Sequence, residues 1–234
     1  MSGGQRSIGT DGLNPLELSR QIDAYCERLG SGLWAEPLNA VTNLAFVLVA
    51  ALLWHRARGV PLARALCVTL AAIGVGSGLF HTFATAWAGA ADTLPILVFI
   101  LIYIFAATRD MLGQRPLVAG LAVLAFFPLA ALTTPLFARL PLYGVSAGYM
   151  IVPVLIAGYA LALARRAPAT ARGLAIGAGL LLLSLSFRSL DAPLCAATVG
   201  IGTHFLWHLL NAVLLGWMIV TYLRHMLAGG ARGR

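Results

Sequence analysis

Long apolar runs separated by short polar segments make up most of the chain. Seven runs come close to or exceed the roughly 20 residues that a helix needs to cross a bilayer, and they lie at about 37–55, 62–85, 91–108, 116–137, 142–164, 171–190 and 201–224. This pattern predicts an all-α integral membrane protein, with a seven-transmembrane helix bundle over residues 37–224. Pro128 and Pro153 fall inside two of the runs and predict kinks there.

The polar ends of the chain are predicted to lie outside the bundle. Residues 1–12 are rich in glycine and polar side chains, which predicts a disordered tail. Residues 13–36 are predicted to form a short interfacial helix and an entry loop. Asn14 would cap this helix, which would continue to Gly30. Residues 225–234 are predicted to be a cytoplasmic tail.

The composition agrees with a membrane protein and excludes a nucleic-acid binder. The chain is 60% hydrophobic and 10% charged, whereas a soluble domain carries about 25% charged residues. Its net charge of +8 comes from sixteen arginines without a lysine. These arginines lie at the ends of apolar runs, as topology signals do. An arginine-only, alanine- and leucine-rich chain is typical of a GC-rich bacterial genome, so we expect the bacterial inner membrane.

The arginines also predict an orientation. Eleven lie after the first, third, fifth and seventh runs, and five lie in the N-terminal segment or in the alternate loops. The side of the membrane with more arginine is the cytoplasmic one. The N-terminus is therefore predicted to lie outside and the C-terminus in the cytoplasm.

Two histidines in the last run are the first candidates for a functional site. His204 and His208 are four residues apart and share one helix face, and Asn211 extends the same stripe. Polar side chains inside a span are costly unless they face a partner, water or a metal. This stretch alone allows two interpretations: two ligands for one cation, or histidines hydrogen-bonded to neighbouring helices.

Further polar residues fall at the same depth as this pair. With the predicted orientation, Ser77 and His81 lie in the outer half of the second run, and Asp92 lies at the start of the third. Three histidines, a carboxylate and a serine are the ingredients of a catalytic zinc site. His81, His204 and His208 would bind Zn²⁺, Asp92 would act as general base or orient a ligand, and Ser77 would hydrogen-bond the substrate carbonyl or the oxyanion. His55 and His225 fall at the cytoplasmic helix ends and are interpreted as interfacial.

These motifs, in this order, resemble the signature of the alkaline ceramidase superfamily, which also includes adiponectin-type receptors and hemolysin III-like proteins. The stretches Tyr25-Cys26-Glu27-Arg28 and Trp34-Ala35-Glu36-Pro37-Leu38-Asn39 resemble the alkaline ceramidase branch in particular. The resemblance implies a zinc-dependent amidase that hydrolyses ceramide to a sphingoid base and a fatty acid. A two-tailed lipid amide would enter such a site sideways from the bilayer.

A calcium site is a further expectation from the resemblance. Eukaryotic alkaline ceramidases share an N-terminal pattern of calcium ligands, Asp-Trp-Cys-Glu-x-Asn followed by a further glutamate. In this chain the matching aspartate and asparagine are replaced, which leaves Asp23, Glu27 and Glu36 as candidate ligands. Because Ca²⁺ prefers six to eight oxygens, this set is small. The alternative is a surface helix with acidic residues and Glu36 as a cap of the first span.

Three other functions remain open at this point. The metal ligands could serve a receptor or channel of the adiponectin-receptor or hemolysin III type. They could belong to a zinc hydrolase for another lipid amide or ester. The histidines could also be hydrogen-bonded parts of a structural membrane protein.

The cysteines add one covalent prediction. Cys67 lies in the second run and is predicted to be a buried thiol. Cys26 and Cys195 both lie on the outer side by the arginine count, where an oxidising compartment favours a disulfide between them. The alternative is two unpaired thiols that are too far apart to bridge.

Overall fold

The computed structural model describes residues 15–30 and 32–232 of the chain. In this part every regular element is a helix, and one isolated β-bridge joins Gln21 to Thr85. The elements are α1 (Pro15–Leu18), α2 (Pro37–Thr42), α3 (Leu44–Trp54), α4 (Pro61–Phe83), α5 (Ala86–Ala106), the π-helical turn η1 (Ala107–Met111), α6 (Pro116–Phe137), the 3₁₀ helix η2 (Tyr143–Tyr149), α7 (Ile151–Leu163), α8 (Pro168–Leu190) and α9 (His204–Arg232).

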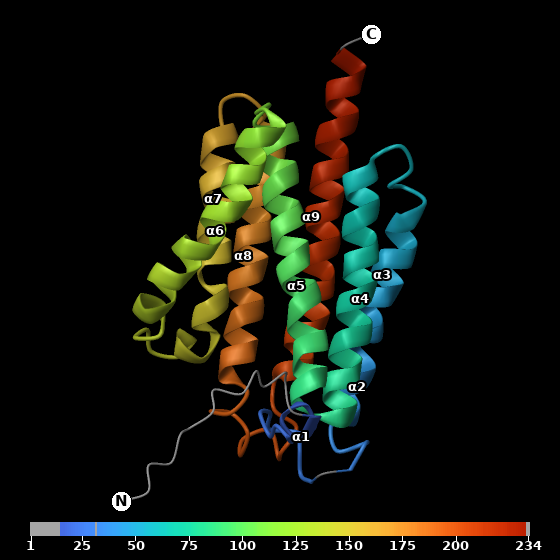
Figure 1. The fold of residues 1–234 in the computed structure, drawn as a ribbon, viewed down its shortest axis with the longest axis vertical. Coiled ribbons are helices and arrows are strands. Elements are labelled where there is room, and N and C mark those ends of the chain that lie inside the picture. Colours follow the sequence, from blue (N-terminus) through green and yellow to red (C-terminus); the bar gives the residue numbers. More distant parts are fainter. Residues whose placement is uncertain (1–14, 31, 233–234) are drawn as a thin grey trace, which may run out of the picture.

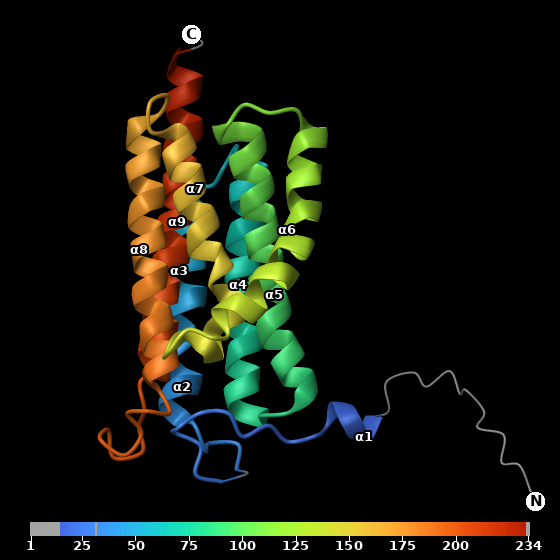
Figure 2. The same ribbon diagram turned by 90° about the vertical axis from the view of Figure 1, so that its left-hand side faces the viewer.

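The long helices run side by side along the long axis of the molecule (Figures 1 and 2). Helix α9 passes between α8 on one side and α3 and α4 on the other (Figure 1). Its inward side chains, among them Leu214, Ile219 and Tyr222, are buried. Helix α6 lies at the edge of the bundle (Figure 2), and only Ala119 and Phe126 of its residues are buried.

The predicted multi-pass membrane architecture is confirmed. Within the described residues, six helical stretches are long and apolar enough to cross a membrane: Pro37–Trp54, Pro61–Phe83, Ala86–Met111, Pro116–Phe137, Pro168–Leu190 and His204–Ala228. A seventh span results if η2 and α7, which meet at an angle of 57°, are counted together. The chain is therefore an all-helical, multi-pass membrane protein with six or seven spans.

The bend between η2 and α7 has a physical cause that the sequence already contains. A proline ring clashes with the carbonyl four residues earlier, so a regular helix cannot run through it undisturbed. For Pro153 that carbonyl belongs to Tyr149, the last residue of η2. The kink predicted at Pro153 therefore appears just before it, at Met150.

The predicted interfacial helix up to Gly30 is wrong. Helix α1 ends at Leu18, and the following described residues, 19–30 and 32–36, cross the end of the bundle as an irregular strap (Figure 2). The backbone N–H of Ile22 donates to the carbonyl of Ala84 at 2.7 Å, and the N–H of Ala86 donates to the carbonyl of Arg20 at 3.0 Å. These long-range bonds replace the local bonds that a helix would make.

Two boundaries also differ from the predicted ones. Helix α5 begins at Ala86, five residues before the predicted start of the third run, and α9 continues to Arg232 through most of the predicted tail. The predicted disordered tail, residues 1–12, and the capping residue Asn14 lie outside the described residues.

The orientation in the membrane stays a prediction, and reporter fusions test it. A reporter that works only in the cytoplasm should be active when it is fused to the C-terminus, because the connections at that end of the bundle carry most of the arginines. The same reporter inserted between Ala84 and Thr85, at the opposite end, should be silent. Activity at the second site and silence at the first would reverse the assignment.

Candidate metal centre

Three buried histidines meet at the end of the bundle that the strap covers. His81 lies in the last turn of α4, and His204 and His208 lie in the first two turns of α9. One ring nitrogen of each lies within 4.8 Å of the other two, and no side chain of the three is more than 2% exposed. The structure therefore brings together the three histidines singled out from the sequence.

Hydrogen bonds on the outer side of two rings fix which nitrogen faces the cluster. Nδ1 of His81 lies 2.5 Å from Oε2 of Glu36, and since a carboxylate only accepts, Nδ1 carries the proton. Nδ1 of His208 lies 3.0 Å from Oγ1 of Thr42, whose own proton is donated to the carbonyl of Leu38. In both rings Nε2 is consequently left with its lone pair.

One ring nitrogen of each of the three histidines is unsatisfied by protein. Within the described residues, Nε2 of His81, Nδ1 of His204 and Nε2 of His208 are buried without a hydrogen-bond partner. A buried polar atom without a partner costs about 1–3 kcal/mol, so three of them at one point need a common explanation. A metal ion would supply it, and the donor set fits one.

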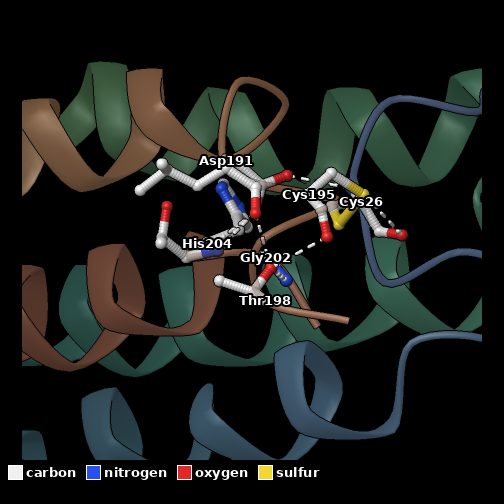
Figure 3. Close-up of a disulfide and its surroundings, with 8 residues drawn as sticks. Cys26, Asp191, Cys195, Thr198, Gly202 and His204 are labelled. Atoms are coloured by element: carbon white, nitrogen blue, oxygen red, sulfur yellow. Dashed lines mark hydrogen bonds between the residues drawn. A yellow bond between two sulfur atoms is a disulfide. The ribbon is translucent and has the colours of Figure 1, made fainter. Parts of the chain in front are cut away.

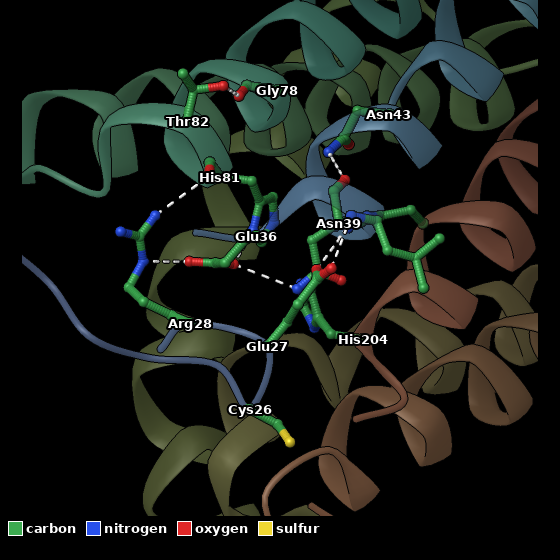
Figure 4. Close-up of polar contacts among 12 residues, drawn as sticks. Cys26, Glu27, Arg28, Glu36, Asn39, Asn43, Gly78, His81, Thr82 and His204 are labelled. Carbon is green, nitrogen blue, oxygen red and sulfur yellow. Dashed lines mark hydrogen bonds and ion pairs between the residues drawn. The ribbon is translucent and has the colours of Figure 1, made fainter. Parts of the chain in front are cut away.

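A buried ion pair supports His81 from behind (Figure 4). Glu36, which is 1% exposed, bonds to His81, to the amide of Asn39 at 3.3 Å and to Nε of Arg28. Burial alone would raise the pKa of the Glu36 carboxyl, but its partners His81 and Arg28 outweigh burial and hold that pKa below its ordinary value. Arg28 also donates to the carbonyl of His81 at 3.2 Å and to that of Gly30 at 3.1 Å.

The structure does not support the predicted calcium site. Both carboxylate oxygens of Glu27 accept backbone N–H groups of the first turn of α2, from Leu38 at 2.7 Å and from Asn39 at 2.8 Å. Glu36 is occupied by Arg28 and His81, and Asp23 is exposed. In the described part of the chain these three carboxylates form no metal-binding cluster.

A disulfide and one aspartate fasten the strap to the segment that connects α8 and α9 (Figure 3). Cys26 and Cys195 are joined by a disulfide across 169 positions of the sequence, the pairing that the sequence predicts. Oδ2 of Asp191 accepts the N–H of Cys26 at 2.9 Å, while its Oδ1 accepts the N–H groups of Thr203 at 2.7 Å and His204 at 2.9 Å. Asp191 therefore caps α9 at its first metal-facing histidine and holds the strap at the same time.

Removing the disulfide should destabilise the protein strongly. The chain-entropy model assigns up to about 5 kcal/mol to a loop of this length. We expect the Cys26→Ser/Cys195→Ser double variant to unfold at a lower temperature than the wild type. A reductant should lower the unfolding temperature of the wild type but not that of the double variant. Cys67→Ala is the control, because Cys67 is a free buried thiol. Free thiols at both positions in non-reducing mass mapping would contradict the bridge.

Tyr25, in the strap, closes the cluster from outside. Its ring stacks on the ring of His204 with centroids 3.7 Å apart, and burial raises the pKa of its hydroxyl. Arg188 approaches from α8, with its guanidinium carbon 5.4 Å from the ring centroid of Tyr149. These aromatic and cationic side chains separate the histidines from solvent.

Ser77 and Asp92 lie beside the histidines and line a cavity with His208 and Asn211. Helices α4 and α5 approach closely at this level, since a Cβ on Gly76 would lie 2.0 Å from the carbonyl oxygen of Ala91. Asp92, which follows Ala91, and Ser77, which follows Gly76 and is 4% exposed, therefore lie on the facing sides of this contact and line the same cavity.

The cavity continues from these polar groups into the middle of the bundle. It follows α9 as far as Met218, which lies ten residues beyond His208, or about 15 Å along the helix. Tyr103 of α5 lines the cavity as well. Apart from the polar groups at the end near the histidines and a few tyrosines, its walls are aliphatic and aromatic. Ile96, Ile100 and Leu155 are among these wall residues. The cavity therefore has a polar end next to the histidines and an apolar part that extends from there toward the middle of the bundle.

Several of these residues escaped the sequence analysis. Arg188 entered it only as a charge in the topology count, Arg28 as such a charge and as part of a motif of the resemblance, and no role was predicted for Thr42 or Asp191. A usable signal existed for Asp191, because it directly follows an apolar run and lies thirteen residues before His204. The others depend on the path of the strap and on helix contacts, which the sequence does not display.

The comparisons with known proteins add one finding. A family model described as Ceramidase matches residues 21–232, which include all three histidines, Ser77 and Asp92. No curated protein matches the sequence significantly.

Proposed function

The chain belongs to the ceramidase family, and from this premise we propose that it is an intramembrane, zinc-dependent amidase that hydrolyses ceramide to a sphingoid base and a free fatty acid. The observation that carries the proposal is the set of three buried, partnerless histidine nitrogens next to a carboxylate, a hydroxyl and an apolar cavity. An anchor for a metal, a proton acceptor and an apolar cavity beside them are what the hydrolysis of a lipid amide needs.

Zinc fits this donor set better than the other common cations. Three neutral imidazoles that leave a coordination position free are a typical catalytic zinc site, whereas Mg²⁺ and Ca²⁺ prefer oxygen ligands. When bound, Zn²⁺ supplies Lewis acidity and lowers the pKa of water to about 7. His81, His204 and His208 would hold it.

Asp92 and Ser77 would carry the proton transfer and the charge. Asp92 accepts the proton of the attacking water at its carboxylate as the new C–O bond forms, and it passes this proton to the amide nitrogen as the C–N bond breaks. Ser77 donates a hydrogen bond from Oγ to the carbonyl oxygen, on which negative charge develops. The products are a carboxylic acid and an amine, and the proton count balances.

The cavity would hold one apolar chain of the substrate. Its aliphatic walls begin next to Ser77, Asp92 and His208 and extend along α9 to Met218. An acyl chain that enters this cavity places its amide carbonyl at the polar end. A lipid already in the bilayer can reach the cavity without crossing water.

Product analysis tests this function directly. Purified protein would be incubated with a panel of ceramides, other lipid amides and lipid esters, with and without a zinc chelator. We expect release of sphingoid base and fatty acid, loss of this activity on chelation, and recovery on addition of Zn²⁺. Zinc-dependent hydrolysis of another lipid amide or ester alone would replace ceramide as the substrate. Absence of hydrolysis over the whole panel would favour a receptor-like role.

Ser77→Ala should reduce turnover without loss of the metal. Removal of an oxyanion donor costs about 10²- to 10³-fold in kcat, and Ser77 is not among the clustered ligands. Thr69→Val is a matched control on the same helix, because Thr69 is buried and its hydroxyl donates to the carbonyl of Ala65. Equal activity of the two variants would contradict the role of Ser77.

A further inference from the structure

Arg28 is a largely buried charge, and two of its hydrogen bonds reach the metal centre. Its side chain is 4% exposed and that of its partner Glu36 is 1% exposed. The guanidinium binds the carboxylate of Glu36 through Nε and the carbonyl oxygen of His81 through its second terminal nitrogen (Figure 4). The strap, the start of α2 and the end of α4 are thereby joined at one point.

Glu36 orients His81 through a hydrogen bond. Its Oε2 accepts the proton on Nδ1 of His81 and so directs the lone pair on Nε2 to the cluster. A buried carboxylate keeps such a position only if cationic or hydrogen-bonding partners hold it, and Arg28 holds Glu36 from the other side. A bound divalent cation could provide the positive charge, but here Arg28 already provides it.

We propose that Arg28 is the built-in cation of the metal centre: a positioning residue that acts through Glu36 on His81 and makes the centre independent of calcium. This inference rests on the metal role proposed above. It also agrees with the position of Glu27, another carboxylate expected to bind calcium, because both of its oxygens accept backbone N–H groups at the start of α2.

Zinc affinity, measured by competition with a chromophoric chelator, tests the inference with a readout other than activity. We expect Arg28→Ala to weaken zinc binding about 10- to 100-fold, the usual cost of losing an outer partner of a metal ligand. Millimolar guanidinium should restore part of this affinity. The zinc affinity of Arg28→Lys should fall between those of the wild type and Arg28→Ala, because an ammonium keeps the charge but lacks the planar set of donors of a guanidinium. Arg20→Ala, an exposed arginine of the same strap, is the control and should bind zinc like the wild type.

The outcomes separate this inference from the proposed function. If neither Arg28→Ala nor Arg28→Lys changes zinc affinity while removal of His204 and His208 abolishes it, Arg28 is merely structural and the metal role stands. If Ca²⁺ raises the zinc affinity or the melting temperature of the wild type, calcium independence is refuted. If the wild type itself binds no zinc, the proposed function fails first.

A second observation, at the opposite end of the bundle, is independent of the metal centre. A cavity of about 660 Å³ lies between the start of α8 and the last turns of α9. Arg166, Arg172 and Arg224 line it, and no acidic side chain does. Within the described residues none of these arginines forms an ion pair.

Two further features of this cavity favour an anionic lipid. Helix α8 begins here without a side-chain cap, so its first N–H groups and its dipole add to the positive field. Ile176, which is 49% exposed, and Trp217 line the same cavity. Basic groups beside apolar ones suit a phosphate that carries acyl chains better than a free phosphate.

From these features we infer that the cavity binds the headgroup of an anionic phospholipid. In nanodiscs, replacing part of the phosphatidylcholine by phosphatidylglycerol should raise the melting temperature of the wild type. The Arg166→Gln/Arg172→Gln/Arg224→Gln variant should lose this shift. Arg56→Gln/Arg58→Gln/Arg115→Gln, which removes three exposed arginines of the same end, should keep it. An equal loss in both variants would reduce the effect to bulk surface charge, and an equal shift with inorganic phosphate would exclude a lipid; either result overturns the inference.

Discussion

Replacing His204 and His208 together by alanine should lower the bound zinc from one ion per chain to almost none. Both rings contribute a partnerless nitrogen to the cluster, and His81 alone cannot hold the ion. Elemental analysis of purified protein measures the stoichiometry. The matched control is His55→Ala/His225→Ala, which removes two histidines that lie outside the cluster.

The same variants distinguish a metal site from a purely structural one. A ligand that binds only the folded state stabilises it by RT ln(1 + [L]/Kd), which is about 4 kcal/mol at a concentration of 1,000 Kd. A chelator should therefore lower the melting temperature of the wild type and of the control, and should leave the His204→Ala/His208→Ala variant unchanged. A chelator without effect on the wild type, or zinc retained in the double variant, would contradict the metal site.

Much of the fold follows from the sequence because the membrane restricts the alternatives. Hydrophobic length and proline positions determine where spans begin: Pro37 and Pro116, the first residues of two predicted runs, are also the first residues of α2 and α6. Shared depth within the spans was enough to associate His81 with the pair on α9. Such features depend on neighbouring residues or on helical periodicity, so they can be read from the sequence without knowledge of the tertiary contacts.

The strap could not be predicted in the same way. Its residues favour a capped helix locally, but their contacts are made with segments far away in the sequence: Ile22 with Ala84, Cys26 with Asp191 and Arg28 with His81. Such contacts outweigh helix propensity, which amounts to less than about 1 kcal/mol per residue. The partners of Glu27 and Glu36, the candidate calcium ligands, could not be predicted for the same reason, because they become visible only when the strap lies across the bundle.

Asp92→Asn should nearly abolish turnover while the zinc content stays that of the wild type. Asp92 lines the cavity beside Ser77 but does not belong to the clustered ligands, so its charge is needed for proton transfer rather than for metal binding. General acid–base groups contribute about 10²- to 10⁴-fold to the rate, and asparagine keeps the size of the side chain but cannot take the proton. We expect kcat to fall within this range.

The control for Asp92→Asn is Asp23→Asn, the same chemical change at an exposed carboxylate of the strap. It should hydrolyse ceramide like the wild type. The two variants would be compared by steady-state kinetics, zinc content and melting temperature on the same preparations. Near-normal hydrolysis by Asp92→Asn would refute its role as base, and a loss of zinc in parallel with activity would instead make Asp92 a support of the metal. Loss of turnover with zinc and stability intact is the combination that only the proposed chemistry produces.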